Sequence, residues 1–456
     1  MNKPSIPKGT RDFLPAQMAR RNHIFDTIKA GFKKYGFLPI ETPAMEKLST
    51  LTGKYGEEGD QLIFKILNRG DKLGTSIRNV PENWSSQGQI EHLLCEQALR
   101  YDLTVPFARF VVQHQNDIAF PFKRYQIQTV WRADRPQKGR YREFYQCDAD
   151  IIGTDSLLCE IELIQLMDEV LDNLGINDFT IKMNNRKVLS GIVEITGESE
   201  KIVEIMVAID KLDKIGESGV IKELEDKGVA RSAVEKIKPL FGIAGSNEEL
   251  LAKMRVMLVD SPIGLKGLEE LTFVIDQINK LGLVKAKLSI DLTLARGLNY
   301  YTGAIFEVKA NGVDIGSICG GGRYDDLTGI FGLKDLSGVG VSFGADRIYD
   351  VLNELNLFEA AVEETTQVLF INFGNPESIY CLGLLKELRT AGINAELYPT
   401  AAKLKKQMNY AHVKGVSFAV MVGTNEIESG IIRVKDMTTG DQIDTSIQGL
   451  INMLNK

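Results

Sequence analysis

The chain has 456 residues, of which 44% are hydrophobic and 25% are charged, and its formal net charge is −7 at pH 7. This length exceeds what one hydrophobic core usually serves, so we expect two or three domains in an ordinary globular protein. The negative balance implies that any nucleic-acid surface is a local basic patch on an acidic body.

Membrane insertion, secretion and metal binding have little support in the sequence. No apolar run approaches the ~20 residues of a membrane span, and the N-terminal MNKPSIPKGT lacks a signal-peptide core, so we expect a cytoplasmic protein. The five cysteines form no CxxC pair, and the four histidines are dispersed without metal-ligand spacing. The sequence therefore indicates neither a disulfide framework nor a zinc site.

The N-terminal part predicts a helix followed by strands. After KGTRDFLP, residues 8–15, apolar residues at helical spacing predict a helix through about Tyr35, and Gly36 is typical of a helix end. FLPIETP, residues 37–43, predicts a strand that ends in proline. Residues 54–71 predict a strand and hairpin region.

Two strands joined by a basic loop are predicted within residues 122–153. In the first, residues 124–132, alternation places polar side chains on one face, namely Arg124, Gln126, Gln128 and Arg132. In the second, residues 143–152, one face carries Phe144, Gln146, Asp148 and Asp150. A row of polar groups on one face is unusual for a strand buried on both sides, and it favours a site.

The connecting loop, residues 132–142, has five basic residues against the single acid Asp134. Arginine's planar fork suits phosphate, so this loop is a candidate for binding a nucleotide triphosphate or a nucleic-acid backbone. A solvated basic hairpin is the alternative, and the polar strand face beside the loop favours the binding role.

The middle of the chain changes character. A helix over residues 159–175 and a strand at 179–184 precede several helical segments with interleaved Glu and Lys and glycine stops, which span residues 185–282. We see no catalytic constellation in these segments. An inserted helical module and a plain structural bundle remain equally open from the residues alone.

Further candidate binding residues occur after residue 289. Arg296 precedes a glycine, which indicates a turn or a close approach of the backbone. In SICGGGRYD three glycines allow close approach to a ligand, and Tyr324 can then reach into the pocket. Arg347 lies in the first turn of a predicted helix, where a cation costs ~0.3–1 kcal/mol unless an anion or π face lies against it. Neutralisation by Asp346 is the alternative to a ligand.

The last 90 or so residues alternate strands with helices and predict a separate α/β domain. Strands are predicted at residues 367–373, 393–399 and 416–423, helices at 378–391 and 401–414, and a hairpin turn at 438–441 precedes a last helix. This part contains no phosphate-loop or dinucleotide motif.

These strings resemble the histidyl-tRNA synthetases, a family of class II aminoacyl-tRNA synthetases. RADRPQKGRYREF, from residue 132, resembles the second signature motif of the class, while YQCDADIIG, LARGLNYY and GGGRYDDL resemble the histidine-specific members. The helix, strand and proline near the N-terminus resemble the first motif, which builds a dimer interface in that class, and the third motif ends at Arg347. The resemblance covers essentially the whole chain.

The resemblance implies an α/β fold class, in which an α+β catalytic domain contains the antiparallel sheet of class II synthetases. It also implies a helical insertion and a C-terminal α/β anticodon-binding domain. The expected boundaries are residues 1–184 and 283–364 for the two parts of the catalytic domain, 185–282 for the insertion and 365–456 for the anticodon-binding domain.

The resemblance further implies a histidine–tRNA ligase that uses ATP and Mg²⁺, acts on L-histidine and tRNA(His), and works as a homodimer. Its implied catalytic residues are Arg132 and Arg296. The implied ATP-binding residues are Arg132, Arg140, Phe144 and Arg347. The implied histidine-binding residues are Asp102, Thr104, Gln146, Asp150, Arg296, Tyr300, Tyr301 and Tyr324. Gln137 is an implied contact for the tRNA acceptor end, and no side chain is assigned to a metal.

One stretch departs from the pattern of many bacterial members, which carry R-P-E-G-T where this chain has R-Y-D-L-T around Asp102. The shorter acid keeps the charge that the α-ammonium group of histidine needs.

Three competing interpretations remain. A catalytically silent paralogue that regulates histidine biosynthesis is the first, although the retained arginines and the C-terminal domain argue against it. A synthetase-like regulatory domain that binds tRNA is the second, and no kinase signature accompanies it. A class II synthetase for another amino acid is the third, and the histidine-specific strings disfavour it.

Overall fold

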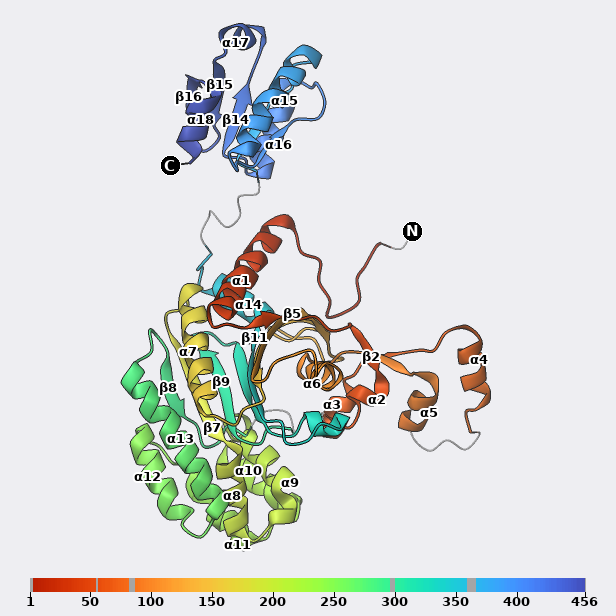
Figure 1. Cartoon of the computed structure of the whole chain (residues 1–456), viewed down its shortest axis with the longest axis vertical. Coiled ribbons are helices and arrows are strands. Elements are labelled where there is room, and N and C mark those ends of the chain that lie inside the picture. Colours follow the sequence, from red (N-terminus) through yellow and green to blue (C-terminus); the bar gives the residue numbers. More distant parts are fainter. Residues whose placement is uncertain (1–2, 55, 82–86, 296–299, 359–365, 456) are drawn as a thin grey trace. The chain divides into compact units, whose positions relative to one another are not determined.

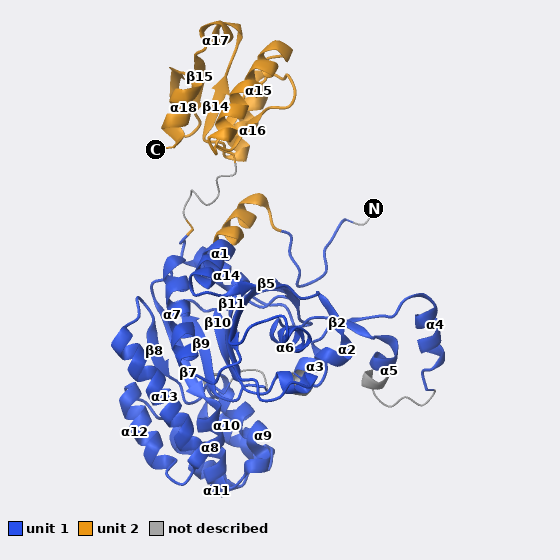
Figure 2. Ribbon diagram, viewed as in Figure 1, with its two compact units in different colours: residues 1–12, 24–357 blue, residues 13–23, 358–456 orange. Residues whose placement is uncertain are grey.

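The computed structural model describes residues 3–54, 56–81, 87–295, 300–358 and 366–455. The chain divides into two compact units, one of Met1–Asp12 with Ile24–Leu357 and one of Phe13–His23 with Phe358–Lys456 (Figure 2). Among the described residues, no helix is both long and apolar enough to span a bilayer.

A large mixed sheet occupies the centre of the first unit (Figure 1). Its strands are β1 (Leu38–Pro39), β5 (Phe122–Trp131), β6 (Glu143–Ile152), β7 (Phe179–Asn185), β8 (Lys287–Ile290), β9 (Ala304–Ala310), β10 (Cys319–Tyr324) and β11 (Gly338–Gly344). Their order is β1-β5-β6-β11-β10-β9-β7-β8. The pairs β1–β5 and β7–β8 are parallel, and the other neighbours are antiparallel. The expected α+β architecture with an antiparallel sheet is confirmed.

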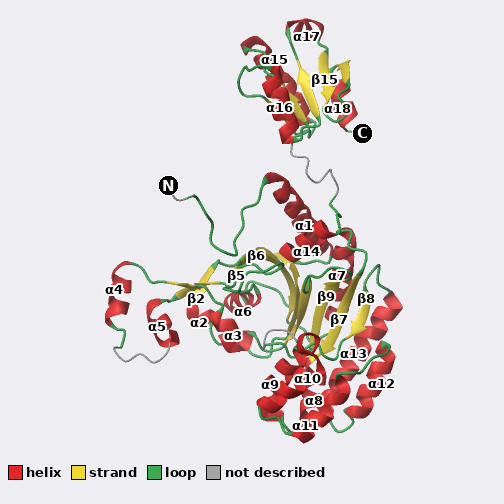
Figure 3. Ribbon diagram, turned by 180° about the vertical axis from the view of Figure 1, so that it is seen from behind, coloured by secondary structure: helices red, strands yellow, loops and turns green. Residues whose placement is uncertain are grey.

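Helices cover both faces of this sheet (Figures 1 and 3). They are α1 (Pro15–Lys34), α6 (Thr104–Gln113), α7 (Leu158–Asn173) and α14 (Ala345–Glu354). On one face, the Arg124 guanidinium of β5 lies 4.2 Å from the Phe107 ring of α6. On the other face, Arg323 of β10 forms a buried ion pair with Glu160 of α7. Consecutive residues of a strand point to opposite faces, so Tyr324, next to Arg323, faces the α6 side.

The predicted N-terminal helix is present, and Gly36 follows it with a φ of 79°. Phe32 of α1 packs on Tyr125 of β5 and Phe343 of β11, with ring centroids 5.4 and 5.8 Å apart. The strand predicted at residues 37–43 is shorter than expected, because β1 comprises two residues and Pro39 has no N–H to extend the ladder.

The strand and hairpin region predicted at residues 54–71 is wrong. The structure places α3 (Gly56–Gln61), the two-residue strand β3 (Lys65–Ile66) and the start of α4 (Gly70–Arg78) there. β3 joins β2 (Met45–Lys47) and β4 (Gln97–Leu99) in a small sheet, beside α2 (Leu48–Leu51) and α5 (Gln87–Leu94). The apolar run LIFKIL, residues 62–67, suggested a longer strand, yet only Lys65 and Ile66 of it form a strand, and the run begins directly after α3.

The predicted helices after residue 185 are present as α8 (Arg186–Thr196), η1 (Ser199–Lys201), α9 (Ile202–Asp210), α10 (Leu212–Asp226), α11 (Arg231–Ile237), η2 (Lys238–Leu240), α12 (Asn247–Met257) and α13 (Pro262–Leu281). Glycines allow α8 and α13 to pack closely, since a Cβ on Gly191 would lie 2.5 Å from the Cα of Gly264. Beyond α13, the buried Asp168 of α7 accepts hydrogen bonds from the backbone N–H groups of Val284, Lys285 and Ala286, which fixes the return to the sheet. A further short helix, η3 (Thr328–Phe331), follows β10.

The second unit contains its own five-stranded sheet in the order β13-β12-β14-β15-β16. The strands are β12 (Val368–Phe370), β13 (Ala395–Leu397), β14 (Phe418–Met421), β15 (Ile432–Asp436) and β16 (Gln442–Thr445). The helices are α15 (Asn375–Thr390), α16 (Leu404–Lys414), α17 (Thr424–Ser429) and α18 (Ile447–Leu454). The predicted α/β pattern is present, and α17 is the element that the sequence analysis omitted.

Candidate active site

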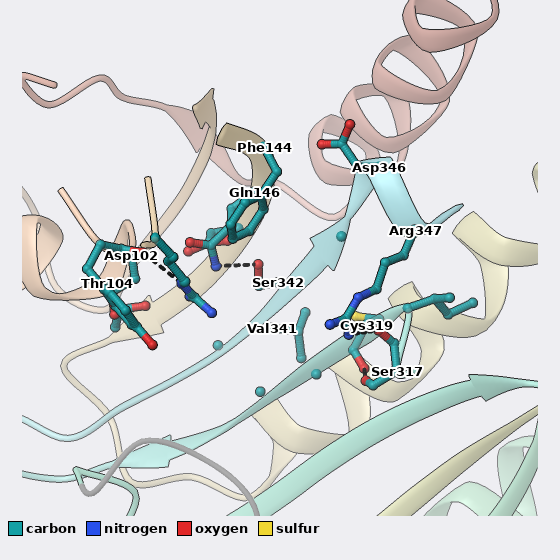
Figure 4. Close-up of a pocket in the computed structure, with 18 of the residues that line it drawn as sticks. Asp102, Thr104, Phe144, Gln146, Ser317, Cys319, Val341, Ser342, Asp346 and Arg347 are labelled. Carbon is teal, nitrogen blue, oxygen red and sulfur yellow. Dashed lines mark hydrogen bonds between the residues drawn. The ribbon is translucent and has the colours of Figure 1, made fainter. Parts of the chain in front are cut away.

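A cavity of about 500 Å³ opens on the α6 side of the large sheet. Its walls come from β6, β10, β11, the start of α14, and loops near residues 101–104, 132–141 and 300–301. The following residues, all proposed from the sequence, line it: Asp102, Thr104, Arg132, Arg140, Phe144, Gln146, Asp150, Tyr300, Tyr301, Tyr324 and Arg347. Figure 4 shows Asp102 and Thr104 at one end, Arg347 at the other, and Phe144 and Gln146 between them.

Of the proposed residues that the structure describes, Gln137 is not among those that line the cavity. Gln137 is exposed in the loop after β5, where its backbone pairs with that of Arg140. Arg296 lies outside the described residues.

Strand β6 supplies the floor through its alternation. Phe144, Gln146, Asp148 and Asp150 all line the cavity, as the period of two predicts. In the register of the sheet, Asp150 lies between Arg124 of β5 and Gly340 of β11. A Cβ on Gly340 would lie 2.0 Å from Oδ1 of Asp150, so only glycine leaves room for this carboxylate.

Glycines elsewhere make room for two tyrosines. A Cβ on Gly338 would lie 2.5 Å from the Tyr324 ring, and one on Gly322 would lie 3.0 Å from the Tyr301 ring. Gly338 and Gly322 therefore leave room for the side chains of Tyr324 and Tyr301.

A buried polar network lies beneath the floor. Nη2 of Arg124 is 2.7 Å from Oδ2 of Asp150, and the hydroxyl of Tyr324 donates to Oδ1 of Asp150 over 2.7 Å. Oδ2 of Asp148 is 4.0 Å from the same Nη2. Burial raises the pKa of both carboxyls, and Arg124 opposes the rise. Burial also raises the pKa of the Tyr324 hydroxyl, so it remains a donor near neutral pH.

The acidic end of the cavity combines Asp102 and Tyr300. Asp102 is 1% exposed, and its Oδ1 accepts a hydrogen bond from the backbone N–H of Val105 at the start of α6. The hydroxyl of Tyr300 donates to Oδ2 of Asp102 over 3.4 Å. An acceptor group held at this position suits an ammonium ligand.

The guanidinium groups of the cavity come from the loop after β5 and from α14. Nε of Arg347 donates to the carbonyl of Gly139 over 2.8 Å, and its Nη1 donates to the carbonyl of Ser317 over 2.6 Å. Nε of Arg132 donates to the carbonyl of Tyr101, and its guanidinium lies 5.3 Å from the Phe144 ring. Two guanidinium groups and an aromatic ring thus face the cavity where anions and a flat ring system can bind.

The N-terminal residues fasten this loop, a relationship that the sequence analysis missed. Arg11 forms an ion pair with Asp346, and its guanidinium lies 3.3 Å from the centroid of the Tyr141 ring. Asp346 also accepts the backbone N–H of Tyr145 over 2.9 Å. Asp346, proposed from the sequence as a possible neutraliser of Arg347, thus binds Arg11 and the backbone of β6. No local pattern signals a pairing across this sequence distance.

Asp148 and Ser342 are cavity residues to which the sequence analysis gave no role. The signal for Asp148 was available, because it shares the strand face of Gln146 and Asp150. Ser342 accepts a hydrogen bond from Nε2 of Gln146 over 3.0 Å (Figure 4). Its place in a small-residue strand carries no comparable signal.

Comparisons with known proteins show which family the chain resembles. A family model described as histidyl-tRNA synthetase matches residues 96–348, and one described as an anticodon binding domain matches residues 367–456. A histidine–tRNA ligase of Bacteroides fragilis is 57% identical over 454 residues, covering 100% of this chain and 99% of that protein.

Solved structures show the same similarity. A histidyl-tRNA synthetase from Nostoc sp. PCC 7120 superposes with a TM-score of 0.83 at 32% identity, covering 100% of this chain and 99% of that one. An ATP phosphoribosyltransferase regulatory subunit/histidyl-tRNA synthetase from Bacillus halodurans gives a TM-score of 0.70 at 21% identity, over 89% of this chain and 97% of that one. The second similarity shows a shared fold alone.

Proposed function

The chain belongs to the histidyl-tRNA synthetase family, and we propose that it is a histidine–tRNA ligase whose cavity activates L-histidine with ATP and passes the histidyl group to tRNA(His). The observation that carries the site assignment is the polarity of the cavity. Carboxylates from Asp102 and Asp150 and guanidinium groups from Arg132 and Arg347 line the same cavity, with Arg347 at the end opposite Asp102 (Figure 4). Histidine and ATP carry the complementary charges.

In the first step the histidine carboxylate attacks the α-phosphorus of ATP, which forms the acyl–phosphate bond of histidyl-adenylate and releases pyrophosphate. The nucleophile is already an anion, so positioning and charge stabilisation carry the rate without a side-chain base. Arg132 and Arg296 would hold the α-phosphate, and Arg140 would hold the departing phosphates. Phe144 and Arg347 would stack on the two faces of adenine. The second step moves the histidyl group to the 3′ end of the tRNA.

The histidine subsite divides between its two polar ends. Asp102 and Thr104 would accept the α-ammonium group. Asp150 and Tyr301 would bind the imidazole, with Gln146 and Tyr324 closing the pocket and Tyr300 beside them. A wrong side chain would leave these buried groups unpaired, which discriminates strongly against other amino acids.

Mg²⁺ enters as part of the nucleotide substrate. Among the described residues, no group of three His, Cys, Asp or Glu side chains is arranged to hold a metal. Mg²⁺ commonly binds through substrate phosphates and retains waters. We therefore assign no protein ligand and derive no step through the ion.

The remaining assignments concern larger partners. Residues 1–184 and 283–364 would form the catalytic domain, 185–282 the insertion, and 365–456 the domain that reads the anticodon. The exposed Gln137 would contact the acceptor end of tRNA(His). A cytoplasmic homodimer is the expected form.

ATP–pyrophosphate exchange with each of the twenty amino acids tests this proposal, because it isolates the first step and needs no tRNA. Exchange with histidine alone is expected. No exchange from folded protein would favour a silent regulatory paralogue, whereas exchange with another amino acid would overturn the histidine assignment.

A further inference from the structure

Besides Asp102 and Asp150, the cavity contains a third buried carboxylate, to which the proposed function gives no role. Asp148 is 2% exposed and lines the cavity. Its Oδ1 atom has no hydrogen-bond partner among the residues that the structure describes. Burial of an unsatisfied carboxylate oxygen is costly, and a donor on a ligand in the cavity that Asp148 lines would supply the missing hydrogen bond.

Asp148 and Asp150 share one arginine, Arg124, which lies closer to Asp150. Arg124 lies 2.7 Å from Asp150 and 4.0 Å from Asp148, and the second oxygen of Asp150 is occupied by Tyr324. Asp150 is thus compensated from two sides within the protein. Asp148 has a hydrogen bond with the Ser342 side chain but retains a free acceptor atom.

The charged and titratable groups around Asp148 come from several elements. They are Arg100, Asp102, Arg124, Asp150, Tyr301 and Cys319. Three carboxylates and two arginines therefore surround a space that the α-ammonium of histidine also enters. Arg100 directs its Nε and Nη1 to the carbonyls of Thr129 and Thr42, away from this carboxylate cluster.

We propose that Asp148 binds the imidazole ring of histidine directly, through a hydrogen bond in which the ring and the carboxyl together hold one titratable proton. This inference rests on the proposed function. Either a protonated Asp148 meets a neutral ring or an ionised Asp148 meets an imidazolium, and both routes give the same complex. No covalent bond changes in this step.

Asp148 and the imidazole of histidine have similar pKa values, so the two groups can share one proton. Burial, together with the nearby Asp150 and against the pull of Arg124, raises the pKa of Asp148 to about 7. A free imidazole side chain titrates near 6.5. Below this range both partners are protonated and one proton must leave, whereas above it neither is protonated and one proton must enter. An amide side chain of similar size, as in Asn or Gln, has no basic nitrogen and cannot share the proton.

The test measures the KM for histidine in ATP–pyrophosphate exchange between pH 6 and pH 8.5, for the wild type and Asp148→Asn. In the wild type, KM should rise about tenfold per pH unit above pH 7, because one proton is taken up on binding. In Asp148→Asn, KM should be raised at pH 7 by about tenfold and should become flat above it. The KM for ATP should change by less than about twofold.

Asp226→Asn is the matched control, because Asp226 is exposed at the end of α10. It should reproduce the wild-type profile. The same slope in Asp148→Asn as in the wild type would overturn the inference, as would an equal rise in the KM values for ATP and histidine. Absence of exchange in the wild type would overturn the proposed function instead.

Ser342→Ala gives a second test that keeps the carboxylate in place. The Ser342 hydrogen bond lowers the pKa of Asp148, so its loss should move the alkaline limb of the KM profile to higher pH. If Asp148→Asn fails to fold, this variant decides the question alone. If the alkaline rise of the KM for histidine occurred at the same pH in Ser342→Ala as in the wild type, the inference would be overturned.

Discussion

The hydroxyl of Tyr324 on β10 donates a hydrogen bond over 2.7 Å to Oδ1 of Asp150 on β6, and both side chains are buried. The two strands are not neighbours, because β11 lies between them. Gly338 and Gly340 of β11 have no side chains on this face, so the tyrosine can reach across the intervening strand. The position of Asp150 therefore depends on glycines that contact no substrate.

Tyr324→Phe should weaken histidine use with little effect on ATP. The variant leaves one oxygen of a buried carboxylate without its donor, which costs about 1–3 kcal/mol. We expect the KM for histidine to rise roughly tenfold or more, measured by ATP–pyrophosphate exchange. Tyr35→Phe is the matched control, since it removes a hydroxyl bound to Glu169 at a distance from the cavity. Equal KM values for histidine in the two variants would contradict the role of Tyr324.

Asp150→Ala should damage histidine use much more than ATP binding. It also leaves the buried Arg124 without its closest carboxylate, and breaking such a pair typically costs about 3–5 kcal/mol of stability. Kinetics should accordingly be measured on protein whose folding is verified by circular dichroism. Asp150→Asn keeps the shape and should retain more stability. An unchanged apparent affinity for histidine in both variants would remove Asp150 from the pocket.

Arg347→Ala should impair ATP use in two ways. It removes a cationic plane from the cavity, and it releases the carbonyls of Gly139 and Ser317, so the basic loop loses an anchor. We expect the KM for ATP to rise by about tenfold or more, with a smaller change for histidine. Lysine should not rescue it, because it lacks the planar fork. Arg389→Ala, which removes similar carbonyl contacts in the second unit, should behave as the wild type.

The sequence predicted those site residues whose positions follow from the pattern of a single strand or helix. Alternation in β6 placed Phe144, Gln146 and Asp150 on one face, and the first-turn position of Arg347 followed from the helix pattern. The contact of Arg11 with Asp346 joins residues 335 positions apart, and no local pattern contains it. The prediction for residues 54–71 was wrong for a different reason. Their apolar run resembles a strand, but in the tertiary structure only two of its residues form one.

Arg11→Ala tests whether the N-terminal residues position the loop. Arg11 is not among the cavity-lining residues, yet it stacks on Tyr141 and pairs with Asp346, next to Arg347. Loss of both contacts should lower kcat/KM for ATP by about tenfold through a looser loop. Lys8→Ala changes an exposed neighbour and should have no effect. If the two variants gave the same kinetics, Arg11 would be a stabilising residue without a positioning role.

Asp148→Asn should change how thermal stability depends on pH in the absence of ligands. Burial raises the pKa of Asp148 to about 7, whereas an unfolded aspartate titrates near 3.9. Between these values the folded protein binds more protons than the unfolded chain, so the free energy of unfolding falls as pH rises through this window. At pH 5 the folded wild type and the variant are both neutral at this position, and at pH 8 only the wild type buries the charge. We therefore expect the difference in Tm, variant minus wild type, to be larger at pH 8 than at pH 5 in scanning calorimetry. A difference that is independent of pH would show that Asp148 is ionised throughout, held so by Arg124, and would leave no titratable proton for it to share.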